Sequence, residues 1–400
     1  MRISTAQMFQ QNTQSLTKGQ SATNKILEQL ASGKKVNTAG DDPVAAIGID
    51  NLKQKNTLVD QYVKNIDYAK NRLGVTESKI GSTETLIDSM RQQLQKGANG
   101  SLSQSERQMV ADEMRTSLDE LLSIANAKDE SGNYLFSGTK TNTPPFAFNN
   151  NGEIVYSGDS GVRQSIVASG VTVGTNVPGD SIFMNAPNPL GDYGVNYLPS
   201  QQGDFLVDSA SIVDPSTYVE DTYTFNFVAN GSDVDLNILD SNGAVVSTVP
   251  NFDPSTPVSF NGIEVQLSGE PVAGDSFTME PQATVSILDE LNSAIALLED
   301  PDLADTPEGN SKLAQLLNSI DSGQKQVSVG RSVAGNSLKG LESIETNHAE
   351  EKIVNGSALS MLEDLDYAAA ITEFEKQQLA LNAVSSVFAK VGSISLFDYI

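Results

Sequence analysis

The sequence predicts an α+β protein: a long coiled-coil-like helical bundle built from both termini, with a β-rich central insertion of one or two modules. Three observations carry this prediction. Apolar residues recur every seven positions in the N-terminal part of the chain and again in the C-terminal part. Between about residues 140 and 281 this period is absent, and glycine, proline, asparagine and β-branched residues take its place.

The N-terminal series predicts one long helix. A period of seven sustained over many turns indicates coiled-coil packing, and a helix of this length spans roughly 60 Å. Asp42 can cap the start of the helix, and Pro43 suits its first turn, where no amide hydrogen bond is needed. The row consists of Leu52, Val59, Ile66, Leu73, Ile80, Ile87 and Leu94.

A second helix is expected after a break at Gly97 and Gly100. Ser103 and Glu106 have the spacing of a capping box, which marks a helix start. An antiparallel helix pair is the simplest arrangement of the two. We therefore assign residues 1–139 to an N-terminal helical arm.

The C-terminal arm, residues 282–400, is also predicted to be helical. A helix is expected to begin at Val285, and Thr306-Pro307 marks the start of a longer one. The apolar row that follows contains Leu313, Ile320, Val327, Ala334, Leu341, His348, Asn355, Leu362 and Ala369. The last stretch carries a helical face formed by Ile371, Phe374, Leu381, Val384, Phe388 and Val391.

The middle of the chain is predicted to be β-rich. Asn151-Gly152 and Asn242-Gly243 lie between apolar runs, which is typical of hairpin turns. The glycine- and proline-rich segment 185–203 is interpreted as a linker or long loop. We therefore expect a first β-rich module with its linker at residues 140–204 and a second module at residues 205–281.

The outermost segments, residues 1–40 and 371–400, have modest apolar stripes and no evident partner within the chain. An unpaired amphipathic helix stays disordered or finds another molecule. We expect both segments to be disordered until assembly. The residues expected to make the assembly contacts are Phe9, Leu16, Leu30, Phe374, Leu381, Val384, Phe388 and Val391.

Composition excludes several classes of partner. The net charge of −26 repels nucleic acid and anionic membrane surfaces. The chain has no cysteine, so thiolate chemistry and disulfides are excluded. The first residues lack the apolar core of a cleavable signal peptide, so we expect any export to use another route.

No catalytic, cofactor or metal site is predicted. The Gly158–Gly161 segment, GDSG, resembles the nucleophile loop of a serine protease, but such a serine needs a histidine base. The one histidine, His348, falls on a heptad row, where we expect it and Asn355 to tune helix register. Gly-Asp-Ser also recurs at two other places, which favours a turn. We expect a protein that is not an enzyme and has no cofactor.

Several motifs carry a resemblance to a known family. LASGKKVNTAGDDPVAA (residues 30–46) looks like the segment after the first helix of flagellins and hook-associated proteins of the bacterial flagellum. GNYLFSGTKTNTPPF (132–146) and VYSGDSGVRQ (155–164) are similar to segments typical of the hook-associated protein 3 family. The last 39 residues resemble the closing helix of the flagellin family.

The resemblance implies a structural role outside the cell. Such proteins leave through the flagellar type III apparatus without a cleaved signal and assemble as a ring at the hook–filament junction. The implied partners are further copies of the chain, hook-associated protein 1, flagellin, and an export chaperone on the C-terminal helix. Two alternatives stay open: filament flagellin itself, and a secreted enzyme with a β catalytic domain.

Overall fold

The computed structural model describes residues 5–231, 233–303 and 305–393. It divides the chain into two compact units, which we call the end unit (Met1–Lys64 with Ser343–Ile400) and the central unit (Asn65–Glu342). The helices of the chain are α1 (Thr5–Ser32), α2 (Pro43–Gly97), α3 (Gln104–Ala125), α4 (Ile287–Glu299), α5 (Pro307–Glu363), α6 (Tyr367–Ser393) and the π-helical turn η1 (Asp180–Met184).

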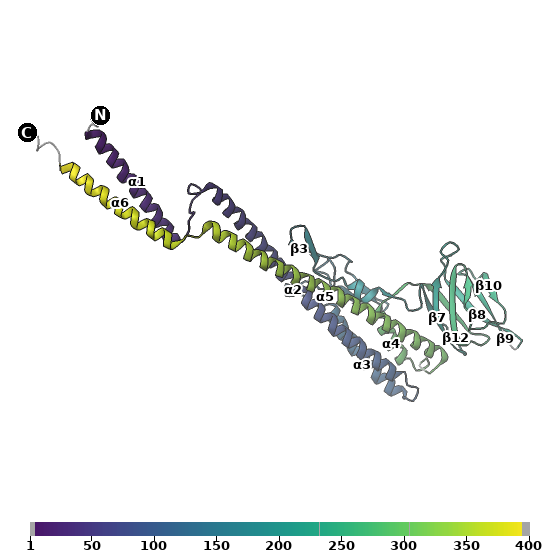
Figure 1. Cartoon of the computed structure of the whole chain (residues 1–400). Coiled ribbons are helices and arrows are strands. Elements are labelled where there is room, and N and C mark those ends of the chain that lie inside the picture. Colours follow the sequence, from purple (N-terminus) through teal and green to yellow (C-terminus); the bar gives the residue numbers. More distant parts are fainter. Residues whose placement is uncertain (1–4, 232, 304, 394–400) are drawn as a thin grey trace, which may run out of the picture. The chain divides into compact units, whose positions relative to one another are not determined.

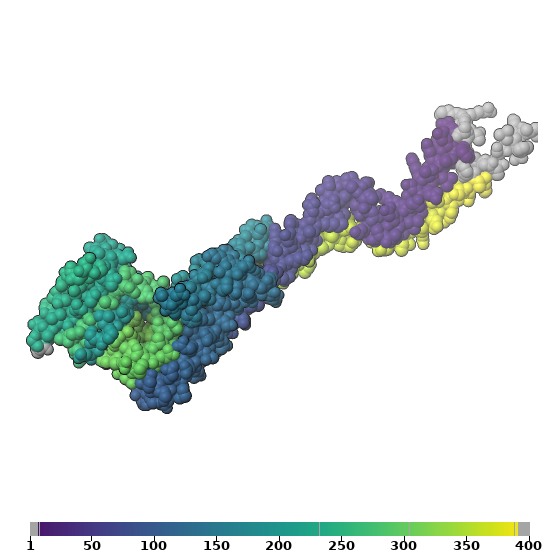
Figure 2. All heavy atoms as spheres, turned by 180° about the vertical axis from the view of Figure 1, so that it is seen from behind, coloured from purple at the N-terminus to yellow at the C-terminus, as the bar shows by residue number. Residues whose placement is uncertain are grey.

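The end unit is made of paired helices from the two ends of the chain. Helices α1 and α6 lie side by side, as the purple and yellow segments show in both views (Figures 1 and 2). The start of α2 pairs with the end of α5 through polar contacts, among them Lys352 Nζ to Asp60 Oδ1 at 2.6 Å. The expected helical bundle from both termini is therefore confirmed.

In the central unit, α2 and α5 continue as the paired helices that the heptads predict. From Ile66 to Leu94 every member of the N-terminal row is buried, and so are Ile320, Val327, Ala334 and Leu341 on α5. Arg331 bridges the two helices by binding Glu77 and Glu84 of α2. Because leucine and isoleucine rows meet in this seam, most of the stability of the helices comes from burial rather than from helix propensity.

Two of the predicted helix starts, those of α2 and α3, are confirmed in detail. Asp42 Oδ1 accepts hydrogen bonds from the amides of Val44 and Ala45, and Pro43 is the first residue of α2. Ser103 and Glu106 form the expected capping box at the start of α3. These caps satisfy amides that the first helical turn leaves without a partner.

The β-rich insertion consists of antiparallel sheets. A five-stranded sheet has the order β10-β9-β8-β13-β6 and a three-stranded sheet the order β11-β12-β7. The strands of these sheets are β6 (Tyr193–Tyr197), β7 (Asp204–Ile212), β8 (Tyr223–Asn230), β9 (Asp233–Leu239), β10 (Val245–Val249), β11 (Val258–Phe260), β12 (Ile263–Glu270) and β13 (Ser276–Pro281).

One aromatic-rich core is shared by the two larger sheets. Phe225 and Phe277 stack with ring centroids 4.4 Å apart, and Phe260 of the smaller sheet meets the edge of the Phe225 ring. Three two-stranded ladders complete the insertion: β1 (Phe146–Phe148) with β2 (Ile154–Tyr156), β3 (Gln164–Ala168) with β4 (Val171–Gly174), and β5 (Ala186–Pro187) with β14 (Thr284–Val285).

The interpretation of residues 185–203 as a linker is wrong for their central part. Tyr193–Tyr197 forms strand β6 and pairs antiparallel with β13, so that Tyr197 opposes Phe277. Both Tyr193 and Tyr197 are fully buried in the aromatic core. The glycine and proline residues around this strand form its turns, and their abundance led to the prediction of a linker. The strand itself is short, and two tyrosines make its core contacts.

Two helix boundaries also differ from the predictions. Val285 is a strand residue, and α4 begins after Ser286, whose side chain caps it. The heptad row from Leu313 to Ala369 does not follow a single helix, because α5 ends at Glu363 and Ala369 lies exposed on α6. Residues 364–366 form a turn that the apolar spacing does not reveal.

Candidate assembly surface

Helices α1 and α6 meet along a seam of half-buried apolar side chains. Leu16 and Leu30 of α1 are half-buried, as are Phe374, Leu381 and Val384 of α6. Gly19 allows a close approach, since a Cβ atom at this position would lie 3.1 Å from Leu381 Cδ2. The two stripes that the sequence left without a partner thus contact each other within the chain.

The seam is incomplete, because side chains in it keep part of their surface open to solvent. Phe9 is 52% exposed, and on the described part of α1 only Thr23 is buried by the packing of the pair. A two-helix layer has no third element to cover the far side of each helix. Of the other predicted assembly residues, Phe388 and Val391 have side chains that lie outside the described part of the structure.

A second apolar face on α6 was missed by the sequence analysis. Leu379 is 69% exposed and Val387 is 52% exposed. Eight residues apart on an α-helix, they lie on the same side, roughly opposite the seam residue Leu381. A helical wheel of α6 shows this second face. The sequence analysis considered only the face that contains Phe374, Leu381 and Val384.

More exposed apolar residues lie elsewhere in the end unit. Large apolar side chains that single helices leave in solvent invite contact with another protein. Besides Leu379 and Val387, they include Leu27, Val44, Ile47, Leu58, Ile353, Val354, Met361, Tyr367 and Ile371. Together with Phe9, we call the exposed residues of α1 and α6 (Phe9, Leu27, Tyr367, Ile371, Leu379 and Val387) the assembly surface.

Polar residues interrupt the α2–α5 seam at the positions that the heptads indicate. The ring of His348 is 6% exposed and stacks on Tyr62 with centroids 5.6 Å apart. Asn355 Nδ2 donates to Asn56 Oδ1 at 3.0 Å. A partly buried polar pair of this kind favours one register over its alternatives, because a shift would leave the buried Asn355 without this partner.

Two of the three Gly-Asp-Ser segments lie in loops, but the turn prediction is wrong for Gly179–Ser181, which begins the π-helical turn η1. Asp159 accepts hydrogen bonds from the amides of Thr139 and Gly161, and the Thr139 hydrogen bonds hold the pKa of its carboxyl below its usual range. The Ser160 hydroxyl donates to Asp180 and has no histidine beside it. In the third segment, buried Asp275 accepts from the amide of Gln202. These aspartates hold loops in place.

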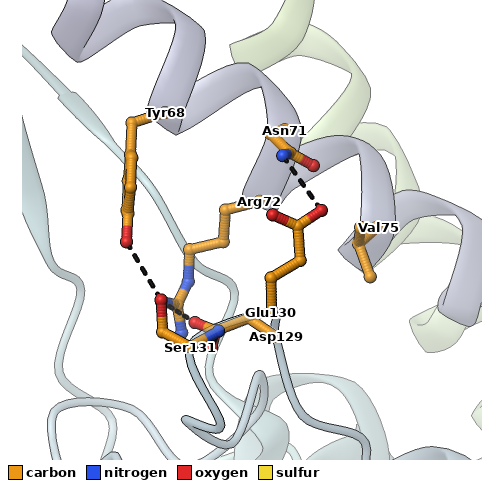
Figure 3. Close-up of a pocket in the computed structure, with 7 residues that line it drawn as sticks. All are labelled: Tyr68, Asn71, Arg72, Val75, Asp129, Glu130 and Ser131. Carbon is orange, nitrogen blue, oxygen red and sulfur yellow. Dashed lines mark hydrogen bonds and ion pairs between the residues drawn. The ribbon is translucent and has the colours of Figure 1, made fainter.

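A cleft of about 100 Å³ lies beside α2 in the central unit (Figure 3). Its floor is a loop, Asp129–Ser131, that three side chains of α2 hold. Arg72 binds Asp129 at 2.6 Å, Asn71 donates to Glu130, and Tyr68 contacts Ser131. Burial lowers the pKa of Arg72, and the nearby Asp129 carboxylate offsets this. These contacts anchor the loop to α2, although the buried Nε of Arg72 has no hydrogen-bond partner.

Metal-binding and membrane-spanning features are absent from the described ranges. No cluster of three or more histidine, cysteine or acidic residues there could hold a metal ion. None of the helices in these ranges is long and apolar enough to cross a bilayer. The most distinctive feature of the structure is therefore the paired terminal helices.

Comparison with known proteins shows what the chain is similar to. Residues 3–141 match the model of the bacterial flagellin N-terminal helical region. Flagellar hook-associated protein 3 of Escherichia coli strain K12 is 26% identical over 405 residues, covering 100% of this chain and 99% of that protein. The chain is thus similar to hook-associated protein 3 over its full length and to flagellins in its N-terminal helical region.

Solved structures of hook-associated proteins are similar to this chain in fold. The hook-associated protein 3 of Legionella pneumophila is 28% identical, with a TM-score of 0.69 over 78% of this chain and 98% of that chain. A structure of the flagellar junction protein from the same organism gives 28% identity and a TM-score of 0.66, over 79% and 99%. Flagellin B of Vibrio anguillarum is also 26% identical, and this match covers 92% of this chain and 90% of flagellin B.

Proposed function

We propose that this chain is a structural adaptor of the bacterial flagellum. It assembles as a ring at the hook–filament junction through its terminal helices. The observation that carries the proposal is the end-to-end match to hook-associated protein 3, together with the fold shared with a flagellar junction protein. A structural role, rather than an enzymatic one, follows from the same relatives.

The terminal helices supply the means of assembly. The exposed apolar residues of α1 and α6 become buried when copies of the chain pack side by side. Because each is already partly covered, each side chain then contributes on the order of 1 kcal/mol. With a net charge of −26, free subunits repel one another at a distance. Apolar contacts at short range therefore provide the attraction.

The proposed partners follow from the position at the junction. On one side the ring contacts hook-associated protein 1, and on the other side it contacts flagellin. Before assembly, a chaperone covers the apolar faces of α6, and the chain leaves the cell without a cleaved signal peptide. The absence of cysteine suits export of an unfolded chain, because no disulfide has to be reduced beforehand.

Filament flagellin is the second candidate, and the 26% identity to flagellin B of Vibrio anguillarum supports it. Immunogold labelling of intact flagella separates the two functions. The adaptor gives one band of label at the end of the hook and a trace band in a sheared flagellar preparation. Label along the whole filament, with the chain as the dominant protein of the preparation, would contradict the adaptor function.

A further inference from the structure

The two connections within the end unit cross each other and are joined by backbone hydrogen bonds. Residues 33–42 connect α1 to α2, and residues 364–366 connect α5 to α6. Lys35 N donates to Glu363 O at 2.7 Å, and Leu365 N donates to Gly33 O at 3.1 Å. This antiparallel bridge is the place where the α1–α6 pair meets the α2–α5 pair.

One buried carboxylate lies at the centre of the crossing. Glu363, the last residue of α5, is 7% exposed and binds the ammonium groups of Lys34 and Lys53. The hydrogen bond from Lys34 lowers the pKa of Glu363, and Lys53 acts in the same direction. Because Lys34 belongs to the first connection and Lys53 to α2, this single group ties three elements together.

The crossing has little room for other arrangements. Gly33 adopts a left-handed backbone with φ of 70°, and a Cβ atom there would lie 2.9 Å from the hydroxyl of Tyr367 at the start of α6. The remainder of the first connection is held to α1, since Asp41 binds Lys25 at 2.8 Å and accepts from the amide of Thr38. The connection is therefore folded back on α1.

We propose that this crossing is a charge-latched joint, with Glu363 as the latch, that fixes the direction in which the α1–α6 pair leaves the α2–α5 pair. Its purpose rests on the proposed function, because α1 and α6 carry the assembly surface. When the Lys34 and Lys53 contacts are lost, two backbone hydrogen bonds remain, and the helix pair turns about residues 33–35 and 364–366. Residues 33–35 of this joint lie within the segment 30–46 that resembles flagellins and hook-associated proteins.

Hydrogen–deuterium exchange of the full-length chain tests the latch. In Glu363→Gln and in Lys34→Met, peptides that contain Lys35 or Leu365 should exchange about tenfold faster than in wild type, since charged hydrogen bonds of this kind are lost. The matched control is Lys55→Met, which removes an ion pair of the same two helices, Lys55 to Glu351 at 3.2 Å, away from the crossing. Lys34→Arg keeps the charge and should keep the wild-type exchange.

The proposal is overturned if Glu363→Gln exchanges at these peptides no faster than Lys55→Met. It is also overturned if Lys34→Arg behaves like Lys34→Met, or if both peptides exchange at the unprotected rate in wild type. Helix content by circular dichroism must match wild type in every variant. A variant with reduced helix content is replaced by Lys53→Met, which removes a contact of the same carboxylate.

A distance measurement tests the effect on direction. The chain has no cysteine, so Lys18→Cys with Glu350→Cys places two unique spin labels at exposed sites on α1 and α5. The latched protein should give one narrow distance distribution, and Glu363→Gln should broaden it. Equal widths would contradict the joint. Hydrogen–deuterium exchange and the spin-label distances are both measured on the free chain. A negative result there contradicts the joint alone, whereas immunogold labelling tests the function at the junction.

Discussion

The end unit and the central unit use the same kind of heptad-patterned helix, but they bury it to very different degrees. Among the side chains that the structure describes, the buried apolar ones of the end unit are Val36, Ile49, Val59 and Ala370. The central unit buries whole rows of leucine and isoleucine and a cluster of aromatic rings. A central helix thus completes its packing within the chain, whereas a terminal helix leaves apolar surface exposed to solvent.

The largest effect is expected from a cavity in the central unit. Phe277→Ala removes a fully buried ring that contacts Phe225 and Tyr197, and it should cost about 3 to 5 kcal/mol of unfolding free energy. Leu16→Ala lies in the half-buried seam of the end unit. It should leave the unfolding free energy of the same transition unchanged within experimental error. Denaturant unfolding followed by tyrosine fluorescence measures both. A similar loss in the two variants would remove the contrast between the units.

A half-buried carboxyl is expected to make the central unit sensitive to pH. Burial raises the pKa of Glu290 on α4 to about 7, while a hydrogen bond with Ser319 opposes the shift and Asp289 adds to it. Since the folded pKa lies above the unfolded value, folding is favoured at low pH. This contribution disappears as the pH rises through about 7, and the total is on the order of 3 kcal/mol.

Glu290→Gln should remove this dependence. Between pH 5 and pH 8 the wild type should lose stability relative to the glutamine variant, and thermal melts across this range measure the difference. Glu299→Gln, on the same helix, is the control. Parallel stability curves for wild type and Glu290→Gln would show that this carboxyl is not responsible.

Limited proteolysis should distinguish the two units by how easily each opens locally. We expect a protease to trim residues 1–40 and 371–400 first and to leave a core of about residues 45–365, because few buried side chains hold the terminal helices. Mass spectrometry of the fragments measures the order of cleavage. Full protection of both ends in a verified monomer would count against the prediction. The disorder of these ends before assembly stays a prediction.

The smallest effect is expected from a chelator. The chain offers no cysteine and one histidine, and no metal cluster occurs in the part of the chain that the structure describes. Dialysis against a strong chelator should leave the melting curve unchanged. A drop of many degrees would reveal a calcium site in the β-rich insertion.

The long helices could be predicted from the sequence, because a coiled coil buries apolar residues at a regular spacing. This spacing can be recognised without knowledge of the rest of the fold. Ile66, Leu73 and Ile80 are buried at the positions that the spacing indicates. Asp42 and Ser103 also cap helices as expected, since capping depends on neighbouring residues alone.

Features that depend on distant parts of the chain could not be predicted. Strand β6 gains its place by pairing with β13, more than 80 residues away, and its Asn-Pro-Gly-rich surroundings indicate only turns. The crossing of residues 33–35 with 363–365 is equally non-local. For the assembly surface, the stripe of Phe374, Leu381 and Val384 was found, but its intrachain contact with α1 and the outer face of Leu379 and Val387 were not.

The central claim is that the terminal helices keep apolar surface for assembly, and one double variant tests it most directly. Leu379→Asp with Val387→Asp places two charges on the outer face of α6, where neither side chain supports the seam with α1. Burying either charge without a partner is costly. The control, Gln378→Asp with Ser386→Asp, adds the same charge at exposed polar positions of the same helix.

The measurement is electron microscopy of flagella from cells that carry each variant as their sole copy of the chain, together with the melting curve of the purified protein. The account predicts that Leu379→Asp with Val387→Asp keeps the wild-type melting curve and is exported, yet gives bare hooks and flagellin shed into the medium, while the control variant forms normal filaments. Normal filaments from the Leu379 and Val387 variant would contradict the account.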